Sequence, residues 1–146
     1  MDATERREIE QECRDLITML TQFGDHREAE NAVALFTKDG TWIRGGKPFK
    51  GHAALLDSYQ RGSATQVTRH IGANTMITVT DDNNATGVTY YIAYHRDPKT
   101  PNPTLPLPLD PPFSMGEWHD KFVRTPAGWR FSFRETRRLF QHEGGH

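Results

Sequence analysis

The sequence predicts an α+β fold, and three observations support this prediction. Apolar residues recur with helical spacing in the first third of the chain, and four later segments are rich in β-branched and aromatic residues. The helical segments precede these strands rather than alternating with them, which is the order of an α+β protein. A length of 146 residues fits one compact domain, so we expect residues 1–146 to form a single unit.

Three helices are predicted in the N-terminal part. The first covers Asp2–Phe23, where an apolar stripe recurs at helical spacing: Ile9, Cys13, Leu16, Ile17 and Leu20. Gly24 is expected to end it, and Asp25 then opens a second helix over His26–Phe36. A third, shorter helix is predicted over Ala53–Tyr59.

The sheet is predicted to begin with a short strand at Thr41–Arg44, between turns at Lys38-Asp39-Gly40 and Gly45-Gly46. Four longer strands follow, at Gln66–Thr80, Thr86–Arg96, Met115–Arg124 and Gly128–Leu139. Hairpin turns join the first pair and the last pair of these strands, and Gly72-Ala73-Asn74 predicts a bulge in the first of them. The result is a curved, mainly antiparallel sheet.

A long connection, residues 97–114, holds seven of the nine prolines. Such a segment cannot enter the sheet interior, so it is either a surface insertion or a lid over a ligand. Residues 141–146 are expected to fray. They contain His142-Glu143-Gly144-Gly145-His146, which matches the zinc-binding pattern H-E-x-x-H, but paired glycines disfavour the helix that this pattern needs. No metal site is expected.

Composition excludes several classes of function. A net charge of −1 provides no general attraction to nucleic acid or anionic lipid, so neither is expected as a partner. No apolar run is long enough to cross a membrane, and the charged first residues do not resemble a signal segment, which predicts a cytoplasmic protein. The single cysteine, Cys13, lies on the apolar stripe of the first helix and predicts a buried thiol.

Leu, Ile, Val and Phe make up only 28 of the 146 residues, which is few for a solid core. Three Trp, four Tyr and eight Phe must supply much of the buried area. This favours a thin aromatic core around a cavity, or a core shared with a second subunit. In the last strand, Trp129, Phe131 and Phe133 alternate with Arg130, Ser132, Arg134 and Thr136. If Arg134 faces inward, the aromatic face is exposed, which predicts a homodimer or homotrimer.

Asp25 and His70 are the first candidates for chemistry. Asp25 follows a predicted helix end and has Glu28 three residues on, which is also the pattern of an N-terminal helix cap. His70 lies within a strand, where a histidine is either a hydrogen-bonded structural residue or, if a carboxylate orients it, a general base. Arg134 is the third candidate, and Asp120 on the adjacent strand is either its ion-pair partner or a ligand contact.

The order of these motifs resembles the SnoaL-like branch of the nuclear transport factor 2-like superfamily over roughly residues 8–140. The resemblance rests on Asp25, Leu35-Phe36-x-x-Asp39-Gly40-x-Trp42, Gly51, Arg69-His70-x-x-x-Asn74, Tyr90-Tyr91, Gly116-x-Trp118-x-Asp120-x-Phe122 and Gly128-Trp129-Arg130-Phe131-x-x-Arg134. It implies a cone-shaped α+β fold, in which a strongly curved sheet wraps three N-terminal helices and encloses an internal cavity.

The resemblance also implies a general acid/base enzyme that needs no cofactor, either a lyase such as the scytalone and bile-acid dehydratases of the superfamily or an isomerase or cyclase. An Asp25–His70 pair would act as the base, with Arg134 as its charge partner. A small hydrophobic cyclic ligand would contact Trp42, Tyr91, Trp118 and Asp120. Leu20 stands where the dehydrochlorinases carry a cavity lysine, which does not support dehalogenation.

Two other classes of function stay open at this point. The superfamily includes non-catalytic members, so the chain is alternatively a ligand-binding protein or an accessory subunit of a larger enzyme such as a ring-hydroxylating oxygenase. Epoxide or ester hydrolysis is a further alternative. A carboxylate–imidazole distance of ~2.6–3.2 Å in an open pocket would favour catalysis, and a filled cavity would favour the non-catalytic class.

Overall fold

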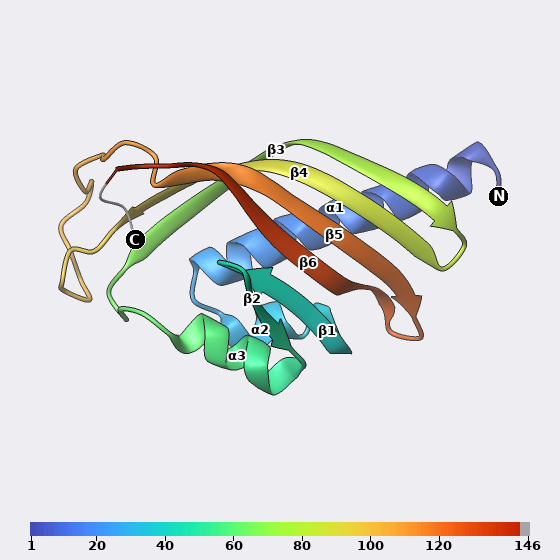
Figure 1. Cartoon of the computed structure of the whole chain (residues 1–146), viewed down its shortest axis with the longest axis horizontal. Coiled ribbons are helices and arrows are strands. Elements are labelled where there is room, and N and C mark those ends of the chain that lie inside the picture. Colours follow the sequence, from blue (N-terminus) through green and yellow to red (C-terminus); the bar gives the residue numbers. More distant parts are fainter. Residues whose placement is uncertain (144–146) are drawn as a thin grey trace.

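The computed structural model describes residues 1–143. Within that range, three helices pack on a six-stranded sheet: α1 (Ala3–Asp25), α2 (Ala29–Val33), β1 (Phe36–Arg44), β2 (Lys47–Lys50), α3 (His52–Gln60), β3 (Val67–Asp81), β4 (Asn84–Arg96), β5 (Ser114–Thr125) and β6 (Gly128–Gln141). The strands lie in the order β2-β1-β6-β5-β4-β3, and all neighbours are antiparallel except β1 and β6. The sheet arches over α1, while α2 and α3 lie near β1 and β2 (Figure 1). The predicted α+β fold with a curved, mainly antiparallel sheet is confirmed.

The apolar stripe of α1 forms much of the core. All five of its predicted members are buried against the sheet: Ile9, Cys13, Leu16, Ile17 and Leu20. Burying each aliphatic side chain contributes about 1.5–3 kcal/mol. A capping box starts the helix, because Asp2 accepts from the backbone N–H of Glu5 and the Glu5 side chain accepts from that of Asp2. Cys13 is the buried thiol that the sequence predicted.

The prediction that Gly24 ends the first helix is wrong. Gly24 lies inside α1, and the helix ends at Asp25 through a Schellman motif. In this motif the N–H of Glu28 donates to the carbonyl of Phe23 at 2.8 Å, and the N–H of Arg27 donates to that of Gly24 at 3.1 Å. Arg27 takes the left-handed conformation, with φ at 61°, where a glycine is more usual. The sequence offered no glycine there to mark the true end.

The second helix is also shorter than predicted, because α2 stops at Val33 and Phe36 already belongs to β1. Tertiary contacts override the helical pattern here. The Phe36 ring stacks on Phe131 at 5.2 Å in the core, and the carbonyl of Leu35 accepts from the N–H of Phe131 at 2.9 Å. The predicted turn before Thr41 lies instead within β1, where pairing with β6 is interrupted.

The outer aromatic face predicted on the last strand does not exist. Phe131 pairs with Phe122 and Phe133 pairs with Lys121, so Ser132 is an extra residue that changes the alternation of β6. Trp129, Phe131 and Arg134 are all buried in consequence, and Phe133 is only half-buried. The bulge thus brings Arg134 to the same inner side as the aromatic core. A bulge after Ala73 in β3, by contrast, was predicted and is confirmed.

The proline-rich connection has no helix or strand between Asp97 and Phe113. Two polar contacts hold this connection against the neighbouring residues. Asp97 accepts a 2.6 Å hydrogen bond from Thr65, and Arg96 pairs with Asp110 at 2.9 Å. The first residue of the H-E-x-x-H pattern, His142, is not helical and donates its backbone N–H to Phe113. Residues 144–146 of that pattern lie outside the described residues. No helix within residues 1–143 is long and apolar enough to cross a membrane, and the cytoplasmic location stays a prediction.

Candidate active site

A cavity of about 260 Å³ opens between the C-terminal end of α1, helix α3 and the inner face of the sheet. Six of the seven residues predicted for the site line it: Asp25, Trp42, His70, Tyr91, Trp118 and Arg134. They come from α1, β1, β3, β4, β5 and β6, which the sheet order brings together around one space. Asp120 is not among the lining residues. A thin core around a cavity therefore explains the shortage of aliphatic residues.

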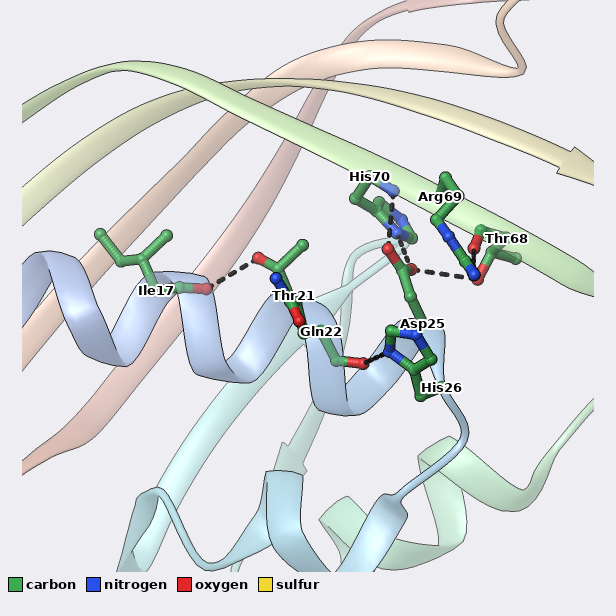
Figure 2. A network of polar contacts seen from close by, with 8 residues as sticks. All are labelled: Ile17, Thr21, Gln22, Asp25, His26, Thr68, Arg69 and His70. Carbon is green, nitrogen blue, oxygen red and sulfur yellow. Dashed lines mark hydrogen bonds and ion pairs between the residues drawn. The ribbon is translucent and has the colours of Figure 1, made fainter.

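Asp25 meets His70 directly at the wall of this cavity. Asp25 Oδ1 lies 2.6 Å from His70 Nδ1, and Asp25 Oδ2 accepts the backbone N–H of His70 at 2.8 Å. The Thr68 hydroxyl adds a third hydrogen bond, 3.1 Å from Asp25 Oδ1 (Figure 2). Thr68 and His70 share one face of β3 because side chains alternate along a strand. Asp25 is therefore not the cap of α2, whose first turn has no side-chain cap.

Two of these hydrogen bonds hold His70 in one orientation, and the third, from Thr68, holds Asp25. An ionised carboxylate only accepts hydrogen bonds, so Nδ1 of His70 carries the proton and Nε2 carries the lone pair when the ring is neutral. Within residues 1–143, Nε2 has no hydrogen-bond partner. The His70 side chain is 34% exposed, whereas that of Asp25 is 5% exposed. A buried carboxylate thus orients the His70 imidazole at the edge of the cavity, an arrangement that is chemically capable of general-base catalysis.

Aromatic side chains flank His70. The rings of Tyr91 and Trp118 stack with centroids 4.9 Å apart and planes 8° from parallel, and the His70 ring lies 6.3 and 6.0 Å from them. Trp42 is held by a 2.8 Å hydrogen bond from its indole nitrogen to Thr136. These rings give the cavity a largely aromatic wall beside His70.

Arg134 and Asp120 form a bidentate ion pair, with Nε–Oδ1 and Nη2–Oδ2 distances of 2.7 and 3.0 Å. Their side chains are 1% and 0% exposed. Burial raises the pKa of Asp120, and the guanidinium of Arg134 opposes that shift. The guanidinium also lies over the Trp118 ring, 4.4 Å from its centroid. Of the two roles that the sequence left open for Asp120, the geometry supports the ion pair.

Two lining residues that the sequence prediction missed are Arg44 and Tyr59. The Arg44 guanidinium lies over Trp42, 4.5 Å from the ring centroid, and over Tyr59 at 5.4 Å. The signal for Arg44 was present, because Trp42-x-Arg44 in a strand places both side chains on one face. Tyr59 follows the buried Leu55 by one helical turn, which gives it the same face of α3.

The Pro-rich loop contributes little to the cavity wall. Of residues 97–114, Phe113 and Ser114 line the cavity, and Phe113 contacts His95, with ring centroids 4.0 Å apart. The prolines do not line it, so the insertion interpretation fits this loop better than the lid. Over residues 1–143, no group of three or more His, Cys, Asp or Glu side chains could hold a metal ion.

The sequence matches the SnoaL-like domain over residues 5–135, most of the chain. The chain belongs to the SnoaL-like family. No curated protein matches this SnoaL-like protein in sequence. Among solved structures it is similar to a candidate scytalone dehydratase from Novosphingobium aromaticivorans, with 19% identity, a TM-score of 0.82 and coverage of 97% of this chain and 91% of the other.

Two further structures have the same fold as this SnoaL-like protein. A hexachlorocyclohexane dehydrochlorinase from Novosphingobium barchaimii matches with 14% identity, a TM-score of 0.78 and coverage of 97% and 93%. An NTF2-like protein with a cystatin-like fold from N. aromaticivorans matches with 24% identity, a TM-score of 0.77 and coverage of 98% and 91%. At these identities the likeness establishes the fold, and the chemistry must be argued from the site itself.

Proposed function

We propose that this SnoaL-like protein is a cofactor-independent enzyme that moves a proton at a carbon atom of a small cyclic substrate. The observation that carries the proposal is the 2.6 Å contact between Asp25 Oδ1 and His70 Nδ1 at the wall of an open cavity. Such a contact orients an imidazole for repeated proton transfer, which needs neither a metal nor an organic cofactor.

In this proposal His70 Nε2 removes a proton from an acidic C–H, and Asp25 stabilises the imidazolium that forms. In a dehydration, the imidazolium returns the proton to the departing hydroxyl, so that water leaves and a double bond forms. In an isomerisation, it returns the proton to another carbon. Arg134 lies beside the cavity and would stabilise negative charge that develops on the substrate, although its pairing with Asp120 reduces the charge it can offer.

Dehydration or isomerisation ranks before the alternatives. The scytalone dehydratase assignment of one structural neighbour supports a lyase. Leu20 lines the cavity where the dehydrochlorinases are expected to place a lysine, so dehalogenation has no support. Epoxide or ester hydrolysis would use the same base to activate water, and no contact in the site favours it. A non-catalytic ligand-binding role or an accessory-subunit role is disfavoured, because the dyad is formed and the cavity is open.

The test is solvent-deuterium exchange into a panel of cyclic ketones and hydroxy ketones in D₂O, followed by mass spectrometry. Wild-type protein should label the acidic carbon of at least one compound. Replacing His70 by Ala or Asp25 by Asn should lower the rate by about 10²- to 10⁴-fold. His119→Gln is the matched control, because His119 lies outside the cavity and pairs with Glu117. Equal rates in wild type and both site variants would refute the mechanism, and no labelling of any compound would favour the non-catalytic class.

We also propose that the protein self-associates, through a different surface from the one the sequence suggested. The outer face of β3 and β4 carries three exposed apolar side chains, Ile71, Met76 and Tyr90. The cross-strand pairs Ile71–Ile92, Ala73–Tyr90 and Met76–Val88 make this stripe continuous. Such a patch on a sheet is typical of a protein interface, which supports the predicted homodimer or homotrimer.

A further inference from the structure

The charged side chains of the cavity wall are mostly positive. Five arginines line it: Arg27, Arg44, Arg61, Arg134 and Arg138. Asp25 is the one carboxylate among its described lining residues, although the whole chain carries a net charge of −1. Asp120 already neutralises Arg134, and Asp57 pairs with Arg61 at 2.8 Å. The remaining arginines have no carboxylate partner within residues 1–143.

Arg44 is the arginine placed deepest among the aromatic side chains. It is half-buried between Trp42 and Tyr59, and its one hydrogen bond goes to the Ser58 hydroxyl at 3.4 Å. Burial lowers the pKa of Arg44, yet a guanidinium stays protonated in proteins. Most of its five N–H donors therefore have no acceptor among the described residues, and because the guanidinium nitrogens are not fully buried, these donors are accessible to solvent or to a ligand. A cation that is half-buried among aromatic rings without a counter-charge is a favourable position for an anionic ligand group.

Tyr59 supplies a second donor beside Arg44. Its hydroxyl is buried and has no hydrogen-bond partner within the described residues. Burial raises the pKa of Tyr59 to about 12, so the phenol keeps its proton and donates. The ring packs against Gly24, since a Cβ at that position would lie 3.4 Å from Tyr59 Cε1. Gly24 directly precedes Asp25, which places this donor near the catalytic dyad.

We propose that the ligand of the cavity is a small cyclic carboxylic acid, whose carboxylate binds Arg44 and accepts a hydrogen bond from Tyr59. This inference rests on the proposed function only for the statement that the cavity is the active site. The planar guanidinium matches a carboxylate in shape and charge. A volume of about 260 Å³ is below the ~300–1,000 Å³ of pockets for drug-sized ligands, so the acid carries one or two rings. The substrate class is therefore anionic rather than purely hydrophobic.

The experiment compares three acids with their neutral amides by calorimetry: benzoate, cyclohexanecarboxylate and 2-naphthoate against the corresponding carboxamides. With wild-type protein, at least one acid should bind about 10- to 100-fold tighter than its amide, which is the effect of a hydrogen-bonded charge. Arg44→Met should abolish this preference, and Tyr59→Phe should reduce it about 3- to 10-fold. Arg96→Gln is the matched control and should change it less than twofold, because Arg96 lies outside the lining of this cavity and already pairs with Asp110.

The inference is overturned if no acid binds more than threefold tighter than its amide, a result that includes the absence of binding by both. It is also overturned if Arg44→Met keeps the acid preference. If the Arg44→Met variant does not fold, Arg44→Lys replaces it in the experiment. Lysine keeps the positive charge but lacks the planar guanidinium, so this variant should show an acid preference between those of wild type and a variant without the charge. These binding results are independent of the deuterium-exchange experiment. A protein that prefers acids to amides but catalyses no exchange would refute the proposed function alone. A protein that catalyses exchange on neutral ketones but shows no preference for acids would refute this inference alone.

Discussion

The buried pair of Arg134 and Asp120 allows a quantitative prediction about stability. Replacing Asp120 by Leu removes one partner and leaves a guanidinium that is 1% exposed without its counter-charge. Breaking such a pair costs about 3–5 kcal/mol in the free energy of unfolding. For a chain of this size each kcal/mol corresponds to ~2–4 °C, so the melting temperature should fall by about 6–20 °C.

The double variant Asp120→Leu, Arg134→Met separates the pair's electrostatics from its packing. It removes both charges but keeps the volume, so it should be about as stable as wild type, or more stable by ~1–4 kcal/mol. Urea unfolding followed by circular dichroism measures both variants. A cost below 1 kcal/mol for Asp120→Leu, or a double variant less stable than the single one, would refute the argument that Asp120 serves to neutralise Arg134.

Further predictions concern other parts of the molecule. Burial raises the pKa of Cys13 to about 12, so its thiol should stay protonated and resist a thiol reagent at pH 8 until urea unfolds the protein; rapid reaction in native buffer would contradict this. Thr68→Val removes one of three hydrogen bonds to Asp25 and should cost about 0.5–1.5 kcal/mol of stability, together with a slower deuterium exchange than wild type. Tyr90→Lys should convert the proposed oligomer to a monomer in light scattering, and a wild-type protein that is already monomeric at micromolar concentration would exclude self-association.

Much of the fold could be predicted from the sequence, because in most elements the spacing of apolar residues and the local residue types indicate the same secondary structure. The stripe from Ile9 to Leu20 is buried as its spacing predicts, and the four long strands begin and end within a few residues of their predicted bounds. The exceptions are local conformations that no residue type signals. Arg27 ends α1 in the left-handed conformation, and Ser132 shifts the alternation of β6.

The site was predictable to the extent that the family resemblance placed Asp25 and His70 together. The residues alone favoured a helix cap for Asp25, because Asp25-x-x-Glu28 matches a capping box. That prediction is wrong, since the end of α1 depends on hydrogen bonds that the sequence does not specify. Arg44 and Tyr59 were missed for a different reason. Arg44 could have been found from its place on the same strand face as Trp42, whereas Tyr59 reaches the cavity wall only through the packing of α3 against β1.

The proposed role of His70 as a base depends on which ring nitrogen carries the proton, and nitrogen-15 NMR at a pH where the ring is neutral measures this directly. We expect a proton on Nδ1 and a free lone pair on Nε2 in wild-type protein, and a loss of this preference in Asp25→Asn. A wild-type ring protonated on Nε2 would refute the proposed role, because no lone pair would then be available to take a proton from a ligand in the cavity.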